Sequence, residues 1–305
     1  MLSGSWGHRH RKNAGRGKRH PAKVNGIALY RSSEEPPGVS FPITSPPNAH
    51  GLLPLVVQRL HRSDFFFINI GANDGINGDP IYPFLRKYGW RGIAVEPLGH
   101  MCDELRRNYA QFEGVVVEHA AIASAPRPFY FVAPDATDAS FIRQTGSLHS
   151  DYIEKTIALM RMYEFQGPVR EGLERSIRQV EVPCLTFEQL LAKHAVQRID
   201  FLNIDAEGSD FEILMMIDFT RWRPSILCLE TSELGDAQEM HAMEVLRLSG
   251  YEYLEPFDFS SQVFVQSEYN VGRARRLLRR LESALRTRGR RGLQAVTASL
   301  RRASR

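Results

Sequence analysis

The chain has 305 residues, 43% hydrophobic and 10% aromatic, which suits one large α/β domain or two ordinary ones. No stretch approaches 18 uninterrupted apolar residues and the charged N-terminus lacks an apolar segment, so we expect neither a transmembrane helix nor a secretory signal. The cysteines, Cys102, Cys184 and Cys228, match no metal-binding spacing. They indicate buried thiols in a reducing cytoplasm.

The formal net charge of +4 is distributed unevenly along the chain. Residues 1–23 carry seven Lys or Arg and no acid, and residues 270–305 carry twelve Arg against Glu282 alone. The remaining body, 24–269, therefore has a net charge of −14. The sequence describes an acidic body with two basic tails, and its basic pI reflects the tails.

The first 50 residues differ in composition from the 219 that follow. Residues 1–50 combine basic residues with a proline-rich stretch, which predicts a disordered arm because such a composition cannot build a packed core. In residues 51–269 apolar runs alternate with helical patterns, which is typical of an α/β domain whose parallel sheet is covered on both faces. The predicted strands are 65–70, 92–96, 115–120, 129–132, 199–205, 225–230, 251–255 and 262–266.

Three helices are predicted between these strands. The first takes Asp79 as its N-cap and Pro80 as its first residue. The second spans 98–112, and the third opens with a capping box between Ser209 and Glu212.

Two further features of the domain are its last two predicted strands and a long segment without predicted strands. The last two predicted strands favour an antiparallel hairpin that closes the sheet. Residues 134–180 are polar and predominantly helical in pattern, and we interpret them as an insertion over the sheet edge.

A glycine turn follows the first strand, in the stretch FFFINIGANDGING. Its glycines are Gly71, Gly75 and Gly78, and Asn73 occupies the place where the dinucleotide fingerprint G-x-G-x-x-G requires its second glycine. The phosphate-binding P-loop requires a lysine that is missing here. The wider G-x-x-x-G spacing that remains indicates S-adenosylmethionine (SAM).

SAM presents a carboxylate, an ammonium, a sulfonium and an adenosine to the turn. Backbone amides from Gly71 to Gly75, together with a helix N-terminus, are predicted to bind the carboxylate. The side chains of Asn69, Asn73 and Asp74 are predicted to meet the ammonium.

The ribose and adenine of SAM need partners from the next two strands. Glu96 ends the second strand, 21 residues beyond Gly75, and its carboxylate can accept hydrogen bonds from both ribose hydroxyls. An acid at this place serves NAD as well, so the glycine spacing decides between the two cofactors. His119 ends the third strand, where it either faces the adenine edge or is a satisfied core residue.

At this point the sequence resembles the FkbM-type SAM-dependent methyltransferases. The resemblance rests on INIGANDG (68–75), GWRGIAVEP (89–97), VPCLTFEQLL (182–191) and IDFLNIDAEGSDFEIL (199–214). It covers about residues 60–267 and leaves both tails outside. It implies a Rossmann-like class I methyltransferase fold: a mostly parallel seven-stranded sheet with an antiparallel C-terminal hairpin and helices on both faces. It also implies SAM as the donor and a hydroxyl oxygen of a sugar or secondary metabolite as the usual acceptor.

Two departures from the family pattern concern the binding site. The GINGDP segment lengthens the connection between the glycine turn and the first helix, which affects the predicted methionine-binding geometry. Asn203 stands where family members often carry Lys, so a role for that lysine has no counterpart here.

Carboxylates follow two strands that would be neighbours in such a sheet. Asp205 and Glu207 come directly after one strand, and Glu230 ends the other. A hydroxyl acceptor must lose its proton, so we expect Asp205 or Glu207 to be the general base, or the three carboxylates to hold a divalent cation. The alternative is that these acids only cap a helix and complement its dipole. In the insertion, Gly146, Ser147 and His149 are candidates for an acceptor-facing loop.

The Arg-rich tail, 270–305, has leucines at near-helical spacing and is predicted to bind nucleic acid or an anionic surface, or to fold back on the acidic body. The leading hypothesis is an O-methyltransferase for a small hydroxylated acceptor. The alternatives are an RNA-binding or RNA-modifying protein that uses its basic tails, and a non-catalytic methyltransferase-like fold.

Overall fold

The computed structural model describes residues 23–24, 27–28, 51–136, 142, 144–163 and 171–269. The predicted Arg-rich tail lies outside these residues. So does the predicted arm, apart from an antiparallel pair formed by β1 (Lys23–Val24) and β2 (Ile27–Ala28). The domain boundaries proposed from composition therefore stay predictions.

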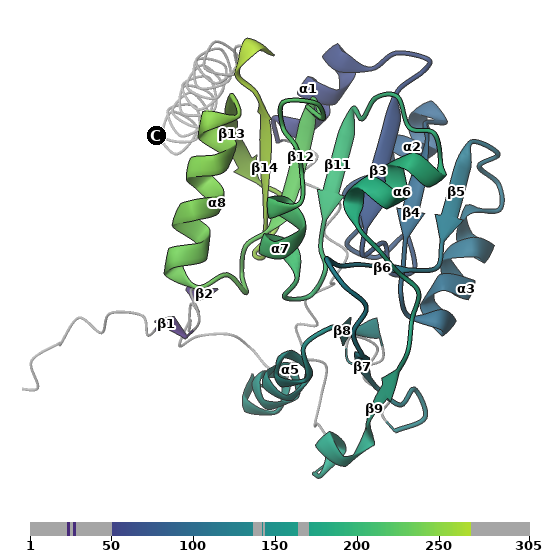
Figure 1. Ribbon diagram of the computed structural model, residues 1–305, viewed down its shortest axis with the longest axis vertical. Coiled ribbons are helices and arrows are strands. Elements are labelled where there is room, and N and C mark those ends of the chain that lie inside the picture. The colour runs from purple at the N-terminus through teal and green to yellow at the C-terminus, as the bar shows by residue number, and fades with distance from the viewer. Residues whose placement is uncertain are drawn as a thin grey trace, which may run out of the picture.

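A seven-stranded sheet forms the centre of the domain (Figure 1). Its order is β13-β14-β12-β11-β3-β4-β5, and only β14 runs antiparallel to its neighbours. The strands are β3 (Phe66–Ile70), β4 (Arg91–Val95), β5 (Val115–Glu118), β11 (Phe201–Ile204), β12 (Ile226–Glu230), β13 (Tyr251–Pro256) and β14 (Ser261–Gln266). The predicted α/β class, the largely parallel sheet and the antiparallel C-terminal hairpin are confirmed.

Helices cover both faces of this sheet because successive apolar side chains of each strand point to opposite sides. On one side, Ile68 and Ile70 of β3 pack in a core with three helices; on the other, Phe67 packs with three more. The first group is α6 (Phe187–Lys193), α7 (Asp210–Met215) and α8 (Asp236–Leu248); the second is α1 (Leu53–Leu60), α2 (Tyr82–Tyr88) and α3 (Gly99–Tyr109). None of the helices in the described ranges has the length and apolarity needed to cross a bilayer.

The insertion forms a small layer of its own beside the carboxyl ends of the main strands (Figure 1). It contains α5 (Ser150–Tyr163) and a three-stranded antiparallel sheet of β8 (Gly146–Ser147), β7 (Phe129–Val132) and β9 (Ile177–Val180). The short helix η1 (Leu173–Ser176) comes directly before β9 in the chain. Ile153 and Ile157 of α5 pack against Val132 of β7. A separate parallel pair joins β6 (Ala121–Ile122) to β10 (Cys184–Leu185), and η2 (Ser267–Tyr269) ends the described chain.

One prediction about this region needs correction. The run 129–132 is a strand, as predicted, but it belongs to the small sheet. The described part of 134–180 is predominantly helical, as predicted, and it also contains β8 and β9. A short apolar run shows that a strand forms but not which partners it will find.

The predicted helix starts also differ in detail. Helix α2 begins at Tyr82, and the Asp79 carboxylate accepts hydrogen bonds from the amides of Ile81 (2.6 Å) and Tyr82 (3.0 Å). Asp79 therefore satisfies the first amides from just outside the helix. Pro83 falls in the first turn, where the missing N–H costs nothing.

The predicted capping box of α7 does not form. Ser209 is the N-cap residue but its side chain makes no cap hydrogen bond. The Asp210 carboxylate accepts instead from the amides of Ala206 (2.7 Å) and Gly208 (3.1 Å). Glu212, the other half of the predicted box, accepts from the hydroxyl of Ser124 at 2.6 Å.

Candidate active site

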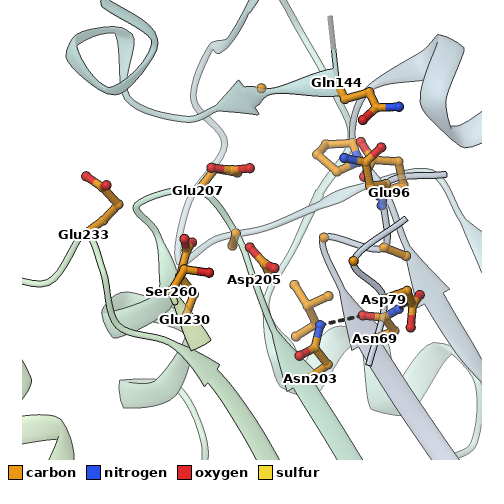
Figure 2. Close-up of a pocket in the computed structure, with 18 of the residues that line it drawn as sticks. Asn69, Asp79, Glu96, Gln144, Asn203, Asp205, Glu207, Glu230, Glu233 and Ser260 are labelled. Atoms are coloured by element: carbon orange, nitrogen blue, oxygen red, sulfur yellow. Dashed lines mark hydrogen bonds between the residues drawn. The ribbon is translucent and has the colours of Figure 1, made fainter. Parts of the chain in front are cut away.

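A cavity of about 770 Å³ lies at the carboxyl edge of the main sheet (Figure 2). Its walls come from the ends of β3, β4, β11 and β12, from the insertion, and from the loop between β13 and β14. This volume is in the range of ligand pockets, and the carboxyl edge of a parallel sheet is where open α/β folds bind ligands.

The turn after β3 brings the backbone of two strands into close contact. Gly71 has φ +76°, and a Cβ there would lie 1.7 Å from the carbonyl oxygen of Asp205. Only glycine fits this position. Gly75 has a different role: its φ is +75°, and a Cβ would meet Leu105 and Tyr109 of α3. Gly71 lines the cavity and Gly75 packs against a helix instead.

The predicted amide cradle is occupied by the protein itself. The amides of Gly71 and Ala72 both donate to the carbonyl of Val95, at 3.0 and 2.9 Å. The Asp74 carboxylate accepts from the amides of Ile76 (2.8 Å) and Asn77 (2.9 Å), so it shapes the loop and is not among the cavity-lining residues.

Glu96 and Asn73 are brought together as a pair at the cavity wall. Asn73 adopts φ 51°, and its amide donates to Glu96 Oε2 at 2.9 Å, while the amide of Leu98 donates to Glu96 Oε1 at 2.7 Å. Burial raises the pKa of Glu96 to about 7, against the lowering effect of these two bonds. The buried Oδ1 of Asn73 has no hydrogen-bond partner within the described ranges, which leaves an acceptor for a ligand.

Asn69 belongs to a buried chain of polar side chains that crosses from β11 to α3. Asn203 donates to Asn69 Oδ1 at 2.8 Å, and Asn69 donates to Asp79 Oδ2 at 2.7 Å (Figure 2). Tyr109 also donates to that Asp79 oxygen, at 3.1 Å. Burial raises the pKa of Asp79 to about 6. Asn203 thus fixes the orientation of Asn69.

The three predicted carboxylates do converge at the ends of β11 and β12. Asp205, Glu207 and Glu230 all line the cavity, with Asp205 between the others and the Asn69 side (Figure 2). Burial raises the pKa of both Asp205 and Glu230, and repulsion from Glu207 and from Asp205, respectively, raises them further. Such crowding disfavours ionisation of all these carboxyls at once.

The insertion is fastened to the main sheet through Glu207, which has φ 51°. The Tyr152 hydroxyl donates to the Glu207 carboxylate, and Ser147 Oγ donates to the Glu207 carbonyl at 2.7 Å. Burial raises the pKa of Glu207 to about 7, while the Tyr152 bond opposes this shift. Of the predicted acceptor-facing residues, Gly146 lines the cavity, whereas the amide of His149 donates to Ser147 Oγ at 3.0 Å.

Some side chains differ from the sequence predictions in whether they line the cavity. His119 Nε2 is 3.0 Å from the carbonyl oxygen of Pro97, and His119 does not line the cavity. Tyr152, Glu233 and Phe259 do line it, and sequence reasoning missed them. Asp79 was found only as a helix cap. Among the residues that the structure describes, no three His, Cys, Asp or Glu side chains have an arrangement suited to a metal ion.

The strand order, the glycine turn after β3 and the acid at the end of β4 define the class I methyltransferase fold. The family model described as the Methyltransferase FkbM domain matches residues 69–254, so the chain belongs to the FkbM methyltransferase family. Nothing among curated protein sequences matches it.

Solved structures show more distant likenesses. A methyltransferase FkbM from Methylobacillus flagellatus KT is 11% identical with a TM-score of 0.39, over 68% of this chain and 45% of that one. The N-terminal domain of human METTL16 is 15% identical with a TM-score of 0.34, over 70% and 66%. The fibrillarin pre-rRNA processing protein of Methanococcus jannaschii is 11% identical with a TM-score of 0.33, over 67% of each chain. The chain thus spans less than half the length of the FkbM structure, and no conclusion about substrate rests on these likenesses.

Proposed function

We propose that the protein transfers a methyl group from SAM to a hydroxyl oxygen of a small acceptor, such as a sugar or secondary metabolite. The observation that carries this proposal is a single cavity with two unlike ends, which we call the donor end and the acceptor end. The donor end is the wall formed by Asn69, Asn73, Asp79 and Glu96; the acceptor end is the wall formed by Tyr152, Glu207, Glu230, Glu233, Phe257 and Phe259. Family membership supports the reaction type.

The donor end has groups that fit SAM. Glu96 retains lone pairs for the two ribose hydroxyls, and the unpartnered Oδ1 of Asn73 is an acceptor for the ammonium. Since the amides of residues 71–73 already donate within the chain, we assign them no bond to the SAM carboxylate. When bound, SAM supplies an electrophilic methyl group on a sulfonium.

Asp205 is placed to receive the proton of the acceptor hydroxyl. It lies between the two ends of the cavity, and burial beside neighbouring carboxylates raises its pKa, which strengthens it as a base (Figure 2). Glu207 adds negative charge beside the pair and orients the insertion through Tyr152. A positioned base contributes roughly 10²- to 10⁴-fold to such a reaction.

Binding and turnover test the proposal in sequence. Titration calorimetry with SAM should give a saturable complex, and label from methyl-labelled SAM should appear in a hydroxylated compound within a panel of glycosides. A protein that binds SAM and yet transfers label only to RNA would replace this proposal by the RNA-modifying alternative. A protein that does not bind SAM would be a non-catalytic member of the fold.

The basic tails and the location belong to the same proposal. A chain shortened by residues 270–305 should keep its rate on a small acceptor, whereas an RNA enzyme should lose affinity and its steep dependence on salt. The three cysteines are all free, which supports the proposed cytoplasmic location.

A further inference from the structure

The charge of the cavity wall is strongly one-sided. Seven carboxylic side chains line it, and the described wall includes no Lys, Arg or His; the acids are Asp79, Glu96, Asp205, Glu207, Glu230, Glu233 and Asp258. An anionic ligand would face uncompensated negative charge here. A cation would let these buried carboxyls ionise and would be held by them.

The acids at the two ends of the cavity differ in their hydrogen bonding. Glu96 accepts from two backbone amides and Asp79 from two amides and two side chains. At the acceptor end, Glu230 is only 6% exposed and its Oε2 has no hydrogen-bond partner within the described residues. An unpaired buried carboxylate oxygen is costly unless a ligand donates to it. The acceptor end therefore has an unmet need for a donor or a positive charge.

Glu233 adds a second carboxylate on the same side of the cavity. Figure 2 places Glu207, Glu230 and Glu233 together, across Asp205 from Glu96 and Asp79. Lys155 on the neighbouring helix α5 is paired with Asp151 at 2.8 Å, and its charge also lowers the pKa of Glu233. Burial raises the pKa of Glu233 as well.

Aromatic side chains line the same cavity as these acids. Tyr152 of α5 and Phe257 line the cavity, as does Phe259, which is 83% exposed in the loop between β13 and β14. A phenyl ring left in water at a cavity wall is suited to contact a ligand. Aromatic faces beside carboxylates favour organic cations and also pack on the apolar face of a sugar ring.

We infer that the acceptor is a hydroxylated amine that is protonated at neutral pH, such as an amino sugar. Glu233 and the free oxygen of Glu230 bind its ammonium group, and Phe259 packs against its ring. The inference rests on the proposed function and specifies its substrate class. The O–CH3 bond forms as the S–CH3 bond of SAM breaks and releases the neutral thioether S-adenosylhomocysteine, and the hydroxyl proton passes to Asp205. The ammonium, which has no free electron pair, is not methylated.

Matched ligands test the inference on the full chain. SAM binding is measured first, by calorimetry. The complex of the protein with S-adenosylhomocysteine, the product of SAM, is then titrated with glucosamine, N-acetylglucosamine, glucosamine 6-phosphate and a short RNA. We expect glucosamine to bind about tenfold or more tightly than its N-acetyl form, since one charge-assisted hydrogen bond separates them. In Glu233→Gln this preference should fall to about twofold or less. It should persist in the control Glu252→Gln, which changes an exposed acid on β13 outside the cavity wall.

The outcomes distinguish a failure of the proposed function from a failure of the proposed substrate class. A protein that fails to bind SAM overturns the proposed function and this inference with it. A protein that binds SAM but binds glucosamine no better than its N-acetyl form, or binds neither, overturns the inference alone. So does tighter binding of the phosphate or the RNA, or an undiminished preference in Glu233→Gln.

Discussion

The donor end and the acceptor end of the cavity are built on different principles. At the donor end, Glu96 and Asp79 accept hydrogen bonds on both carboxylate oxygens from amides and side chains of the protein. At the acceptor end, a buried oxygen of Glu230 has no partner in the described part of the chain, and Phe259 is exposed. The acids of the first end are preorganised, whereas Glu230 at the second end retains an oxygen that a ligand can satisfy.

This difference assigns distinct tasks to similar residues. The donor end must bind one invariant compound, so its carboxylates are fixed by hydrogen bonds from strand ends and turns. In the proposed reaction the acceptor end selects a substrate and takes up a proton, and its crowded carboxyls have raised pKa values that suit a base. Variants at the donor end should therefore change SAM affinity and stability, and variants at the acceptor end should change turnover and its dependence on pH.

The largest effect is expected from Asp205→Asn. The amide keeps the shape of the side chain but cannot accept the hydroxyl proton, so turnover should fall by roughly 10²- to 10⁴-fold while SAM binding stays nearly unchanged. Single-turnover transfer of methyl label and calorimetry measure the two quantities. Asp236→Asn, at an exposed position of α8, is the control. Full activity of Asp205→Asn would remove the assignment of Asp205 as the base.

The next effect, at Asp79 in the donor end, is a dependence of the free energy of unfolding on pH. The pKa of Asp79 is raised to about 6 in the folded protein, so the folded state holds this proton where the unfolded state has released it. Stability from this group is greatest below its unfolded pKa and decreases as the pH rises through about 6. As the pH falls from 7 to 4, we expect the free energy of unfolding of wild type to increase relative to that of Asp79→Asn. The increase should be about 1.4 kcal/mol for each unit by which folding raises the pKa of Asp79.

Urea unfolding of both proteins at intervals across this pH range measures the effect. A constant difference between wild type and Asp79→Asn would mean that Asp79 is ionised throughout, and that it accepts its hydrogen bonds as a carboxylate and not as a partly protonated acid.

A smaller effect at the same end should follow Glu96→Gln. Glutamine has one acceptor oxygen in place of two, so one backbone amide and one ribose hydroxyl lose their partner. We expect the Kd for SAM to rise by about 10- to 100-fold, equivalent to one lost hydrogen bond to a charged group. Glu113→Gln, an exposed acid after α3, should bind SAM like wild type. An unaltered Kd in Glu96→Gln would place the ribose elsewhere.

The two ends also differ in how far the sequence could predict them. The donor end follows from short-range patterns: an apolar strand, a glycine turn and an acid at the next strand end placed Gly71, Asn73 and Glu96 at one edge. Even there the local detail failed, because Asp74 and Gly75 serve the loop and α3 instead of the cavity. Spacing identifies a turn, but it does not determine which side chains the turn itself will use.

The acceptor end depends on contacts between distant segments. The convergence of Asp205 and Glu230 was predictable because both follow neighbouring parallel strands. Tyr152 lies 55 residues from Glu207 in an insertion whose strands were expected to be helical, so no periodicity connects them. Phe259 belongs to a hairpin loop, and its contact with the cavity depends on how the hairpin pairs with β12.

The smallest effect tests the link between the insertion and the main sheet at the acceptor end, through Tyr152→Phe. The Tyr152 hydroxyl donates to Glu207 and lowers its pKa, which burial has raised to about 7. Without this bond the Glu207 pKa should rise further, and a smaller fraction of Glu207 would be ionised at pH 7. Asp205 is the proposed base and the charge of Glu207 raises its pKa, so a less ionised Glu207 should lower the pKa of Asp205. The midpoint of the rate against pH should therefore move to lower pH, with turnover at pH 6 raised about threefold relative to wild type and the two proteins equal at pH 8.5. Tyr130→Phe, on β7 of the same insertion, should leave the midpoint in place. A uniform loss of rate at every pH in Tyr152→Phe would instead indicate that Tyr152 only supports the packing of α5, and that the insertion does not influence the charge at the reacting centre.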